Sequence, residues 1–585
     1  MKKILKYAFA AFAATAMTTS CSDFGSLNTD PEHLNEGNIN MALVFSNAQH
    51  QSLGSDWDAW RNGLIYLSQW NQHIAAGGWW WSYAINAFSN DYAASYWGSV
   101  YAGGRGALKD AMMCMNYWNE TNPVERAMAE VVRIYTGQRM TDLHGDIPFL
   151  QASQPDKYPY PEYDKQQDLY MSMLDRLNEC QKLFKAGEKS IVGDNDLWYQ
   201  GDMGKWKKFT NSLLLRVAMR LTKVDPATAQ KWAAIAYQNG CILTNDDDCY
   251  LAHSDGSFSN DSSEPYAKII SHEDQDVPYI SVTFMELLKD DPRIPLIMSI
   301  YPETEFEMKK DYIPGAEGLA WCKPELQRGL PMAASMVPKE DSGSEASVQW
   351  WNEEYTTEML KDPSSPNYYK RTHSRPNHYT YGDWQAPTWV VTAAQTNFLL
   401  AEAAERGWIS GKSASAFYEA GFRAACKQFE KYPNQQVATL MNSYLNEAAI
   451  SKYLNDHKYK GGNEGIKQIN TQYWINCFCD EYETYANWRR SGYPELKELC
   501  SKFDKANKKG INPKTGEAPV RDFKDFEFYP SSDGYADAIV RRFPYPTSET
   551  TGNRDNMLKA LERIGIVGTE SDFNNSRVWW DKVTN

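Results

Sequence analysis

Apolar side chains recur every three or four residues over several long stretches of this chain, which is the spacing of one face of an α-helix. The pattern predicts helices over Pro123–Met140, Gln166–Phe184, Lys205–Lys223 and Pro226–Gln238. The last of these begins with a proline, which suits a first helical turn because the N–H that proline lacks would have no partner there. These stretches indicate a mostly helical protein.

A further stretch, Thr396–Phe429, predicts two helices joined by a short Gly-Ser turn. Small residues recur along both helices at Ala401, Ala403, Ala404, Ala416, Ala420, Gly421, Ala424 and Ala425. The length and the small-residue pattern resemble one tetratricopeptide unit, whose helices pack closely where alanine and glycine cross. A few such hairpins would build a curved scaffold.

The composition changes between about residues 255 and 389, where Pro, Gly, Ser, Asn and Tyr dominate. Apolar residues keep a helical spacing there only near Phe284–Lys289. Long irregular segments in compact proteins are usually functional or disordered, and disordered segments are poor in aromatics. This one contains Tyr368, Tyr369, Tyr379, Tyr381, Trp384 and Trp389. We therefore predict a single domain over residues 21–585, with a helical scaffold at about 28–254 and 390–556 and an ordered, loop-rich insertion at about 255–389.

The amino terminus has the pattern of an export signal. Lysines precede a short apolar stretch, Tyr7–Ala16, which is too short to remain as a membrane-spanning helix. Small residues then lead to Cys21, as in a lipobox whose cysteine is acylated and becomes the new amino terminus, although Thr18 stands where leucine is usual. The alternative is an ordinary signal peptide that leaves a free cysteine. We predict a signal peptide over residues 1–20 and lipidation at Cys21. Several acyl chains on this cysteine would anchor the protein stably in a membrane.

The amino-acid composition indicates which classes of partner the protein can bind. The formal net charge of -15 disfavours nucleic acid, which requires a basic face. Aromatic residues make up 14% of the chain, including 21 Trp and 36 Tyr. Such a content fits contact with carbohydrate or peptide, although cores and interfaces use aromatics as well.

The ten cysteines show no CxxC spacing of a zinc site or redox motif. Cys241 and Cys249 bracket a short loop and could pair, whereas most of the others are expected to be small buried hydrophobes.

Apparent catalytic signals have simpler explanations. Gly407–Ser413 is one residue short of a phosphate-binding loop and follows a helix, so we interpret it as a hairpin turn in which Ser413 or Ser415 caps the next helix. The segment Thr244–Cys249, "TNDDDC", lacks the spacing of a calcium loop and is predicted to be a solvated turn. No HExxH or GxSxG motif occurs, and the nine histidines form no ligand cluster. We predict no enzyme, no cofactor and no metal.

Several segments together resemble one family. They are "LNTDPEHL" (27–34), "MTDLHGDIPF" (140–149), "YQGDMGKWKKFTNSLLLRVAMRL" (199–221), "FLLAEAAERGW" (398–408), "WRRSGYPEL" (488–496) and "RRFPYPTSE" (541–549). In this order they resemble the SusD/RagB family of nutrient-binding outer-membrane lipoproteins of Bacteroidetes, in its SusD-like branch. The matches extend from just after Cys21 to about residue 556.

The resemblance implies an all-α fold with about four tetratricopeptide-like hairpins. It also implies a lipid-anchored protein on the exterior of the outer membrane, which captures oligosaccharides and delivers them to a SusC-like TonB-dependent β-barrel transporter. Alternatives remain open: peptide cargo, a helical-repeat adaptor with no nutrient ligand, or an exported glycoside hydrolase or peptidase.

Family ligand sites have no motif, so the candidates are aromatics in loops. Trp79-Trp80-Trp81 follow two glycines, and neither a helix nor a strand points three adjacent side chains the same way. At least one should therefore face away from the core, with Asn86 or Asn90 nearby for sugar hydroxyls. The triplet could instead pack against Tyr92, Tyr96 and Trp97 or bury against the transporter. Further candidates are Trp321, Trp350, Trp351, Tyr379, Tyr381 and Trp384.

Overall fold

The computed structural model describes residues 39–76, 89–101, 106–254, 262–272, 278–300, 314–330, 373–496, 503–504, 509–510, 539–567 and 576–582. Its contacts divide the chain into two units, Met1–Leu43 and Val44–Asn585. The elements discussed below belong to the second unit.

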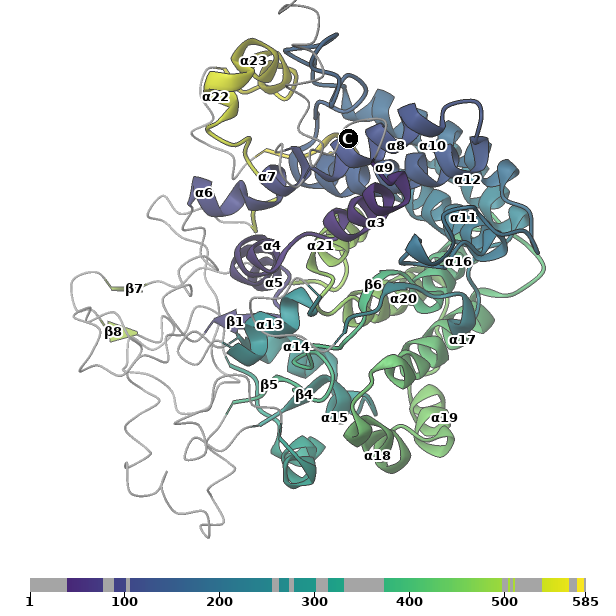
Figure 1. Cartoon of the computed structure of the whole chain (residues 1–585). Coiled ribbons are helices and arrows are strands. Elements are labelled where there is room, and N and C mark those ends of the chain that lie inside the picture. Colours follow the sequence, from purple (N-terminus) through teal and green to yellow (C-terminus); the bar gives the residue numbers. More distant parts are fainter. Residues whose placement is uncertain are drawn as a thin grey trace, which may run out of the picture. The chain divides into compact units, whose positions relative to one another are not determined.

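The first half of this unit is a run of helices that pack on their neighbours (Figure 1). They are α8 (Ala107–Trp118), α9 (Pro123–His144), α10 (Gln166–Leu183), α11 (Met203–Met219) and α12 (Pro226–Asn239). The predicted helices are confirmed, and their ends differ from prediction by four residues or fewer. Asp202 and Asp225 cap α11 and α12 by accepting the backbone N–H of Lys205 and Thr228 at 3.0 Å each.

The predicted hairpin is also present, as α16 (Ala393–Glu405) and α17 (Ala414–Lys427). Gly421 of α17 faces α16 so closely that a Cβ there would lie 2.7 Å from the ring of Phe398. Ser413 caps α17, as one of the two predicted capping residues, by accepting the N–H of Ala416. The turn therefore has the structural role that its sequence indicated.

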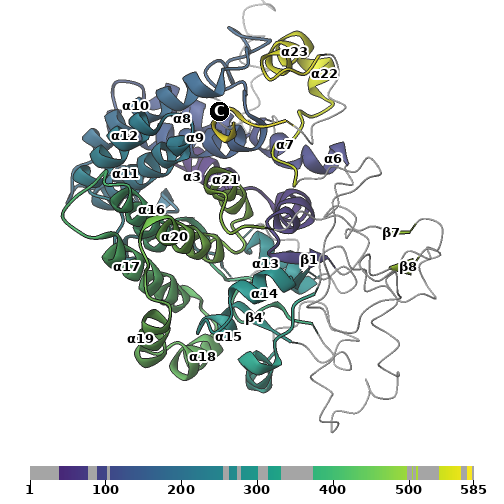
Figure 2. The same ribbon diagram turned by 180° about the vertical axis from the view of Figure 1, so that it is seen from behind.

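The hairpin continues into α18 (Gln435–Tyr444), α19 (Glu447–Asp456), α20 (Gly462–Asn476) and α21 (Glu481–Ser491). Figure 2 shows α20 beside α16, on which it packs. Within the described residues, consecutive long helices also pack together: α8 with α9, α10 with α11, α16 with α17, and α20 with α21. The mostly helical fold is thus confirmed.

Short elements fill the segment between α12 and α16. Helices α13 (Pro265–His272), α14 (Val282–Leu287) and α15 (Ile294–Ile297) alternate with strands of two to four residues, and 3-10 turns follow at Ala316–Cys322 and Pro324–Leu326. Strand β2 (Cys249–Leu251) pairs antiparallel with β6 (Thr388–Val391), and β1 (Ile74–Ala76) with β3 (Pro278–Ile280). Strand β4 (Met298–Ser299) pairs with β5 (Arg375–Pro376). The β1–β3 pair therefore connects this segment to an earlier part of the chain, and the β2–β6 pair joins the two ends of the segment.

Buried ion pairs link helices within and between the two helical halves, by which we mean α8–α12 and α16–α21. Arg220, just after α11, donates to Asp142 of α9 at 3.2 Å and to Glu483 of α21 at 2.5 Å. Arg490 of α21 donates to Glu402 of α16 at 2.8 Å. Burial raises the pKa of Glu402, but Arg490 and Arg406 outweigh it and hold this pKa at about 2. Glu402 is therefore ionised and paired.

The structure decides two points about the segment after α12. Cys241 and Cys249, whose pairing the sequence left open, do not pair; both are free, buried thiols. The "TNDDDC" turn is not fully solvated, because Asp248 is buried and accepts the N–H of Ala393, the first residue of α16, at 2.6 Å. Burial raises the pKa of Asp248 to about 7. Its sequence looked like a surface turn because its capping partner lies far along the chain.

Within the described residues, no helix has the length and apolar character needed to cross a membrane.

Replacing Arg220 by leucine should leave Asp142 and Glu483 buried without their cation. The loss of one partner of a buried pair costs about 3–5 kcal/mol of unfolding free energy. Urea unfolding followed by circular dichroism measures it. The control Lys452→Ala breaks the exposed Lys452–Asp456 pair and should leave the unfolding midpoint unchanged. Equal midpoints for both variants would contradict the role given to Arg220.

Candidate functional site

A group of partly exposed aromatic side chains lies where α4 (Asp56–Asp58) continues into the π-helix η1 (Ala59–Leu67), beside α6 (Asn90–Ala93). We call Trp57, Trp60, Arg61 and Tyr92 the aromatic patch. The ring centroids of Trp57 and Trp60 are 5.4 Å apart, and those of Trp60 and Tyr92 are 5.9 Å apart. Trp57 is 52% exposed, which is high for a tryptophan.

Arg61 stabilises this arrangement. Its guanidinium lies 4.7 Å from the ring centre of Trp57 and 5.1 Å from that of Tyr92. Such cation–π contacts contribute about 0.5–1 kcal/mol each at exposed sites. The rings are therefore held in place before any ligand arrives, which reduces the entropy lost on binding.

Asp58 supports the aromatic patch from the protein interior. Its buried carboxylate accepts the hydroxyls of Ser95 at 2.7 Å and Ser99 at 2.6 Å, both in α7 (Ser95–Tyr101). It also accepts the N–H of Ser55 at 2.7 Å, which closes the capping box at the start of α4. Because Asp58 points inward, its neighbour Trp57 is directed outward.

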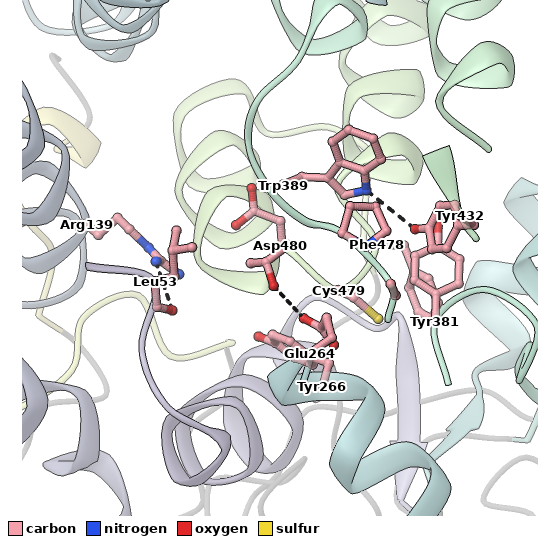
Figure 3. A pocket seen from close by; sticks show the side chains of 13 residues that line it. Leu53, Arg139, Glu264, Tyr266, Tyr381, Trp389, Tyr432, Phe478, Cys479 and Asp480 are labelled. Carbon is pink, nitrogen blue, oxygen red and sulfur yellow. Dashed lines mark hydrogen bonds between the residues drawn. The ribbon is translucent and has the colours of Figure 1, made fainter. Parts of the chain in front are cut away.

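A second feature is a small cavity between α13, β6 and the turn before α21, shown in Figure 3. Its volume is about 40 Å³, enough for about three water molecules. Aromatic rings of Tyr381, Trp389, Tyr432 and Phe478 form one wall. A neighbouring cavity of about 20 Å³ shares three of these residues, Tyr381, Trp389 and Tyr432. Neither space accommodates an oligosaccharide.

Charged groups line the larger cavity on its other side. Burial raises the pKa of Glu264 to about 7. Burial also raises the pKa of Asp480 to about 6, although Arg139 and Arg216 oppose the rise. Arg139 lines the same cavity and donates to the carbonyl of Leu53 at 3.2 Å.

The structure places the predicted site residues unevenly. Six of them lie outside the described residues: Trp79, Trp80, Trp81, Asn86, Trp350 and Trp351. Asn90 has its side-chain oxygen occupied by the N–H and hydroxyl of Thr547, both at 2.9 Å.

The remaining candidates are more enclosed than a sugar platform requires. Trp321 is 5% exposed and packs on Ile300, and Tyr379 is fully buried with its hydroxyl bonded to the carbonyl of Gly315. This structure offers neither ring to a ligand, because residues distant in sequence cover both. Tyr381 and Trp384 are half-buried, and Tyr381 faces the cavities rather than an open surface.

Sequence reasoning missed the aromatic patch itself. Trp57, Trp60 and Arg61 have the i, i+3, i+4 spacing that places side chains on one helical face. That spacing in an otherwise polar stretch was the available signal.

No cluster of three or more metal-ligating side chains occurs in the described part of the chain. Two of the three carboxyls of "TNDDDC" face different protein partners: Asp247 pairs with Lys208 at 2.8 Å, and Asp248 caps α16.

Comparison with known proteins agrees with this fold. The SusD-like_2 family model, described as "Starch-binding associating with outer membrane", matches residues 37–515. The chain belongs to the SusD-like family. Members of this family are binding proteins associated with the outer membrane. No curated protein matches the chain.

Solved structures give the same result. A chitin-binding protein is 28% identical, with a TM-score of 0.68, over 93% of this chain and 100% of its own. A SusD-like protein of Bacteroidetes AC2a is 24% identical with a TM-score of 0.71 and the same coverage. A SusD homolog of Bacteroides fragilis is 22% identical with a TM-score of 0.64, again over 93% and 100%. The last two show the likeness of fold alone.

Replacing Asp58 by alanine should destabilise the protein and loosen the aromatic patch. The change leaves the buried hydroxyl of Ser99 and the hydroxyl of Ser95 without their acceptor, and we expect a loss of about 3 kcal/mol. Thermal unfolding measures it. Asp91→Ala on the neighbouring α6, an exposed site, should have no effect. An unchanged midpoint in Asp58→Ala would contradict the support role.

Proposed function

We propose that this SusD-like protein is a cell-surface lipoprotein that captures oligosaccharides and delivers them to a SusC-like TonB-dependent outer-membrane transporter. The observation that carries the proposal is the aromatic patch, in which the half-exposed ring of Trp57 contacts the guanidinium of Arg61 and the ring of Trp60. The family description as starch-binding and the chitin-binding relative support a carbohydrate cargo.

The physics of the patch suits sugar recognition. A sugar ring presents an apolar face of C–H groups, which an exposed indole covers while the hydroxyls stay hydrated. The patch is shallow, so we expect dissociation constants in the micromolar to millimolar range, about -8 to -4 kcal/mol. Weak binding is sufficient because tethering beside a transporter raises the effective ligand concentration at the pore.

The patch also lies close in sequence to the tryptophan triplet. Strand β1 ends at Ala76 and α6 begins at Asn90, so Trp79, Trp80 and Trp81 belong to the connection that leads to Tyr92. We propose that the triplet extends the same platform, with Asn86 as a polar contact. Trp350 and Trp351 remain a second candidate pair.

The first test is calorimetric titration of the soluble form that lacks the residues before Ser22, with separate glycan and peptide libraries. Trp57→Ala should weaken binding of a glycan at least about tenfold, equivalent to about 1.4 kcal/mol. Trp80→Ala and Trp351→Ala test the residues proposed from the sequence.

Tyr160→Ala is the matched control, because Tyr160 is 68% exposed and lies outside the patch. It should bind like the unmodified protein. A glycan hit that none of the tryptophan variants weakens would contradict the platform. A peptide hit would establish peptide as the cargo, and no hit in either library would favour an adaptor.

The anchor has its own test. Cys21→Ala should move the protein from the membrane fraction to the soluble fraction and abolish labelling by a radioactive fatty acid, because the acylated thiol is removed. Ser22→Ala should remain membrane-bound and labelled. Membrane retention of Cys21→Ala would contradict lipidation at this residue.

A further inference from the structure

Three side chains from separate segments form a continuous hydrogen-bond chain beside the larger cavity. His253, just after β2, has its Nδ1 at 3.1 Å from the carbonyl of Ser262 and its Nε2 at 2.8 Å from the hydroxyl of Thr388 in β6. The same hydroxyl lies 3.0 Å from a carboxyl oxygen of Glu264, at the start of α13. We call His253, Thr388 and Glu264 the proton chain.

The number of protons in this chain follows from its geometry. A carbonyl only accepts, so Nδ1 of His253 must carry a proton and donate it to Ser262. If the imidazole is neutral, Nε2 accepts and Thr388 must donate to it. Thr388 then has no proton left for Glu264, so the carboxyl must supply one.

A second complete arrangement with no additional proton has a charged imidazolium and an ionised carboxylate, with Thr388 donating to Glu264. Both arrangements contain the same number of protons, and they differ only in where these lie. With one proton fewer, one of the three hydrogen bonds cannot form. The three links together therefore require one dissociable proton.

We propose that Glu264 is a neutral carboxylic acid that holds this proton, and that its loss breaks the link between α13 and the β2–β6 pair, so that the cavity wall senses pH.

The surroundings favour the neutral arrangement over the ion pair. Glu264 is 6% exposed, and its second oxygen accepts the N–H of Ala267 at 2.6 Å. Burial raises the pKa of Glu264 to about 7 and lowers that of His253 to about 4. Between these values the carboxyl is protonated and the imidazole is neutral.

Other titratable groups among the described residues lie near the proton chain, but none of them forms an ion pair with Glu264. Across the cavity stand Arg139, Asp480, Cys479, Tyr266, Tyr381 and Tyr432, and His50 acts on His253. On α13 itself, Lys268 is paired with Asp56 at 3.0 Å. None of these charges is among the causes that shift the pKa of Glu264, which are burial and hydrogen bonds.

The expected dependence on pH has a definite sign. Between the ordinary glutamate value of 4.5 and about 7, the folded protein binds the proton of Glu264 while the unfolded chain does not. Stability from this group is therefore complete below 4.5 and is lost as pH rises through 7. His253 contributes the opposite slope between about 4 and 6.5.

The test compares the soluble form that lacks the residues before Ser22 with its Glu264→Gln variant in urea unfolding from pH 5 to 9. The amide supplies an N–H to Thr388 and a carbonyl to Ala267, so it reproduces the neutral acid at every pH. The contribution of His253 is common to both proteins and cancels. Relative to Glu264→Gln, the unfolding constant of the unmodified protein should rise up to about tenfold per pH unit below 7 and then level off.

Controls and a second variant make the outcome decisive. Glu188→Gln changes an exposed carboxyl and should follow the unmodified protein. Thr388→Val removes the hydroxyl that joins His253 to Glu264 and should shift the pH window, whereas Thr388→Ser should leave it unchanged.

Infrared difference spectra at pH 6 provide a readout independent of unfolding. The unmodified protein minus Glu264→Gln should show the carbonyl band of a protonated carboxylic acid. Absence of that band, or a ratio of unfolding constants that does not vary with pH, would overturn the proposal.

Discussion

Arg220 places one buried positive charge between carboxylates from parts of the chain that are far apart in sequence, and both helical halves meet around it. Asp142 belongs to α9, and Glu483 lies 263 residues beyond Arg220 in α21. Glu483 also faces Arg216 of α11 at 3.6 Å. An ionised side chain in the interior costs several kcal/mol unless it is paired, so each of these charges requires the others to be in place. Such a network disfavours alternative packings of similar helices.

The same network positions the surface that we assign to ligand binding. Helix α21 begins with Glu481, whose carboxylate accepts the side-chain amide of Asn71 at 2.6 Å and contacts His73 Nδ1 at 2.9 Å. Both partners directly follow the helical segment that carries the aromatic patch, and η1 packs on α21. The fixed scaffold therefore determines where Trp57 and Arg61 emerge. A rigid support of this kind lets a shallow surface bind without a large entropic cost.

The aromatic patch and the larger cavity have different physical characters. The patch is partly exposed and is held by ring and cation contacts, whereas the cavity is lined by carboxyls of Glu264 and Asp480, whose pKa values burial raises to about 7 and about 6. A glycan surface and a proton-dependent link can therefore coexist in one protein without competing for residues. Strand β6 contributes to both the proton chain and the cavity wall, because Thr388 belongs to the proton chain and Trp389 lines the cavity.

The amino-acid sequence by itself determined the helices, because their apolar spacing and caps act within a few residues. It therefore predicted α9 to α12 and the α16–α17 hairpin closely, and its motifs indicated the family that the comparisons confirm. Only the tertiary structure decided which aromatics are accessible. Trp321 is covered and Trp57 is exposed because burial depends on contacts between residues far apart in the chain. For the same reason the sequence did not reveal the proton chain. Its three members come together only when β2, α13 and β6 are folded.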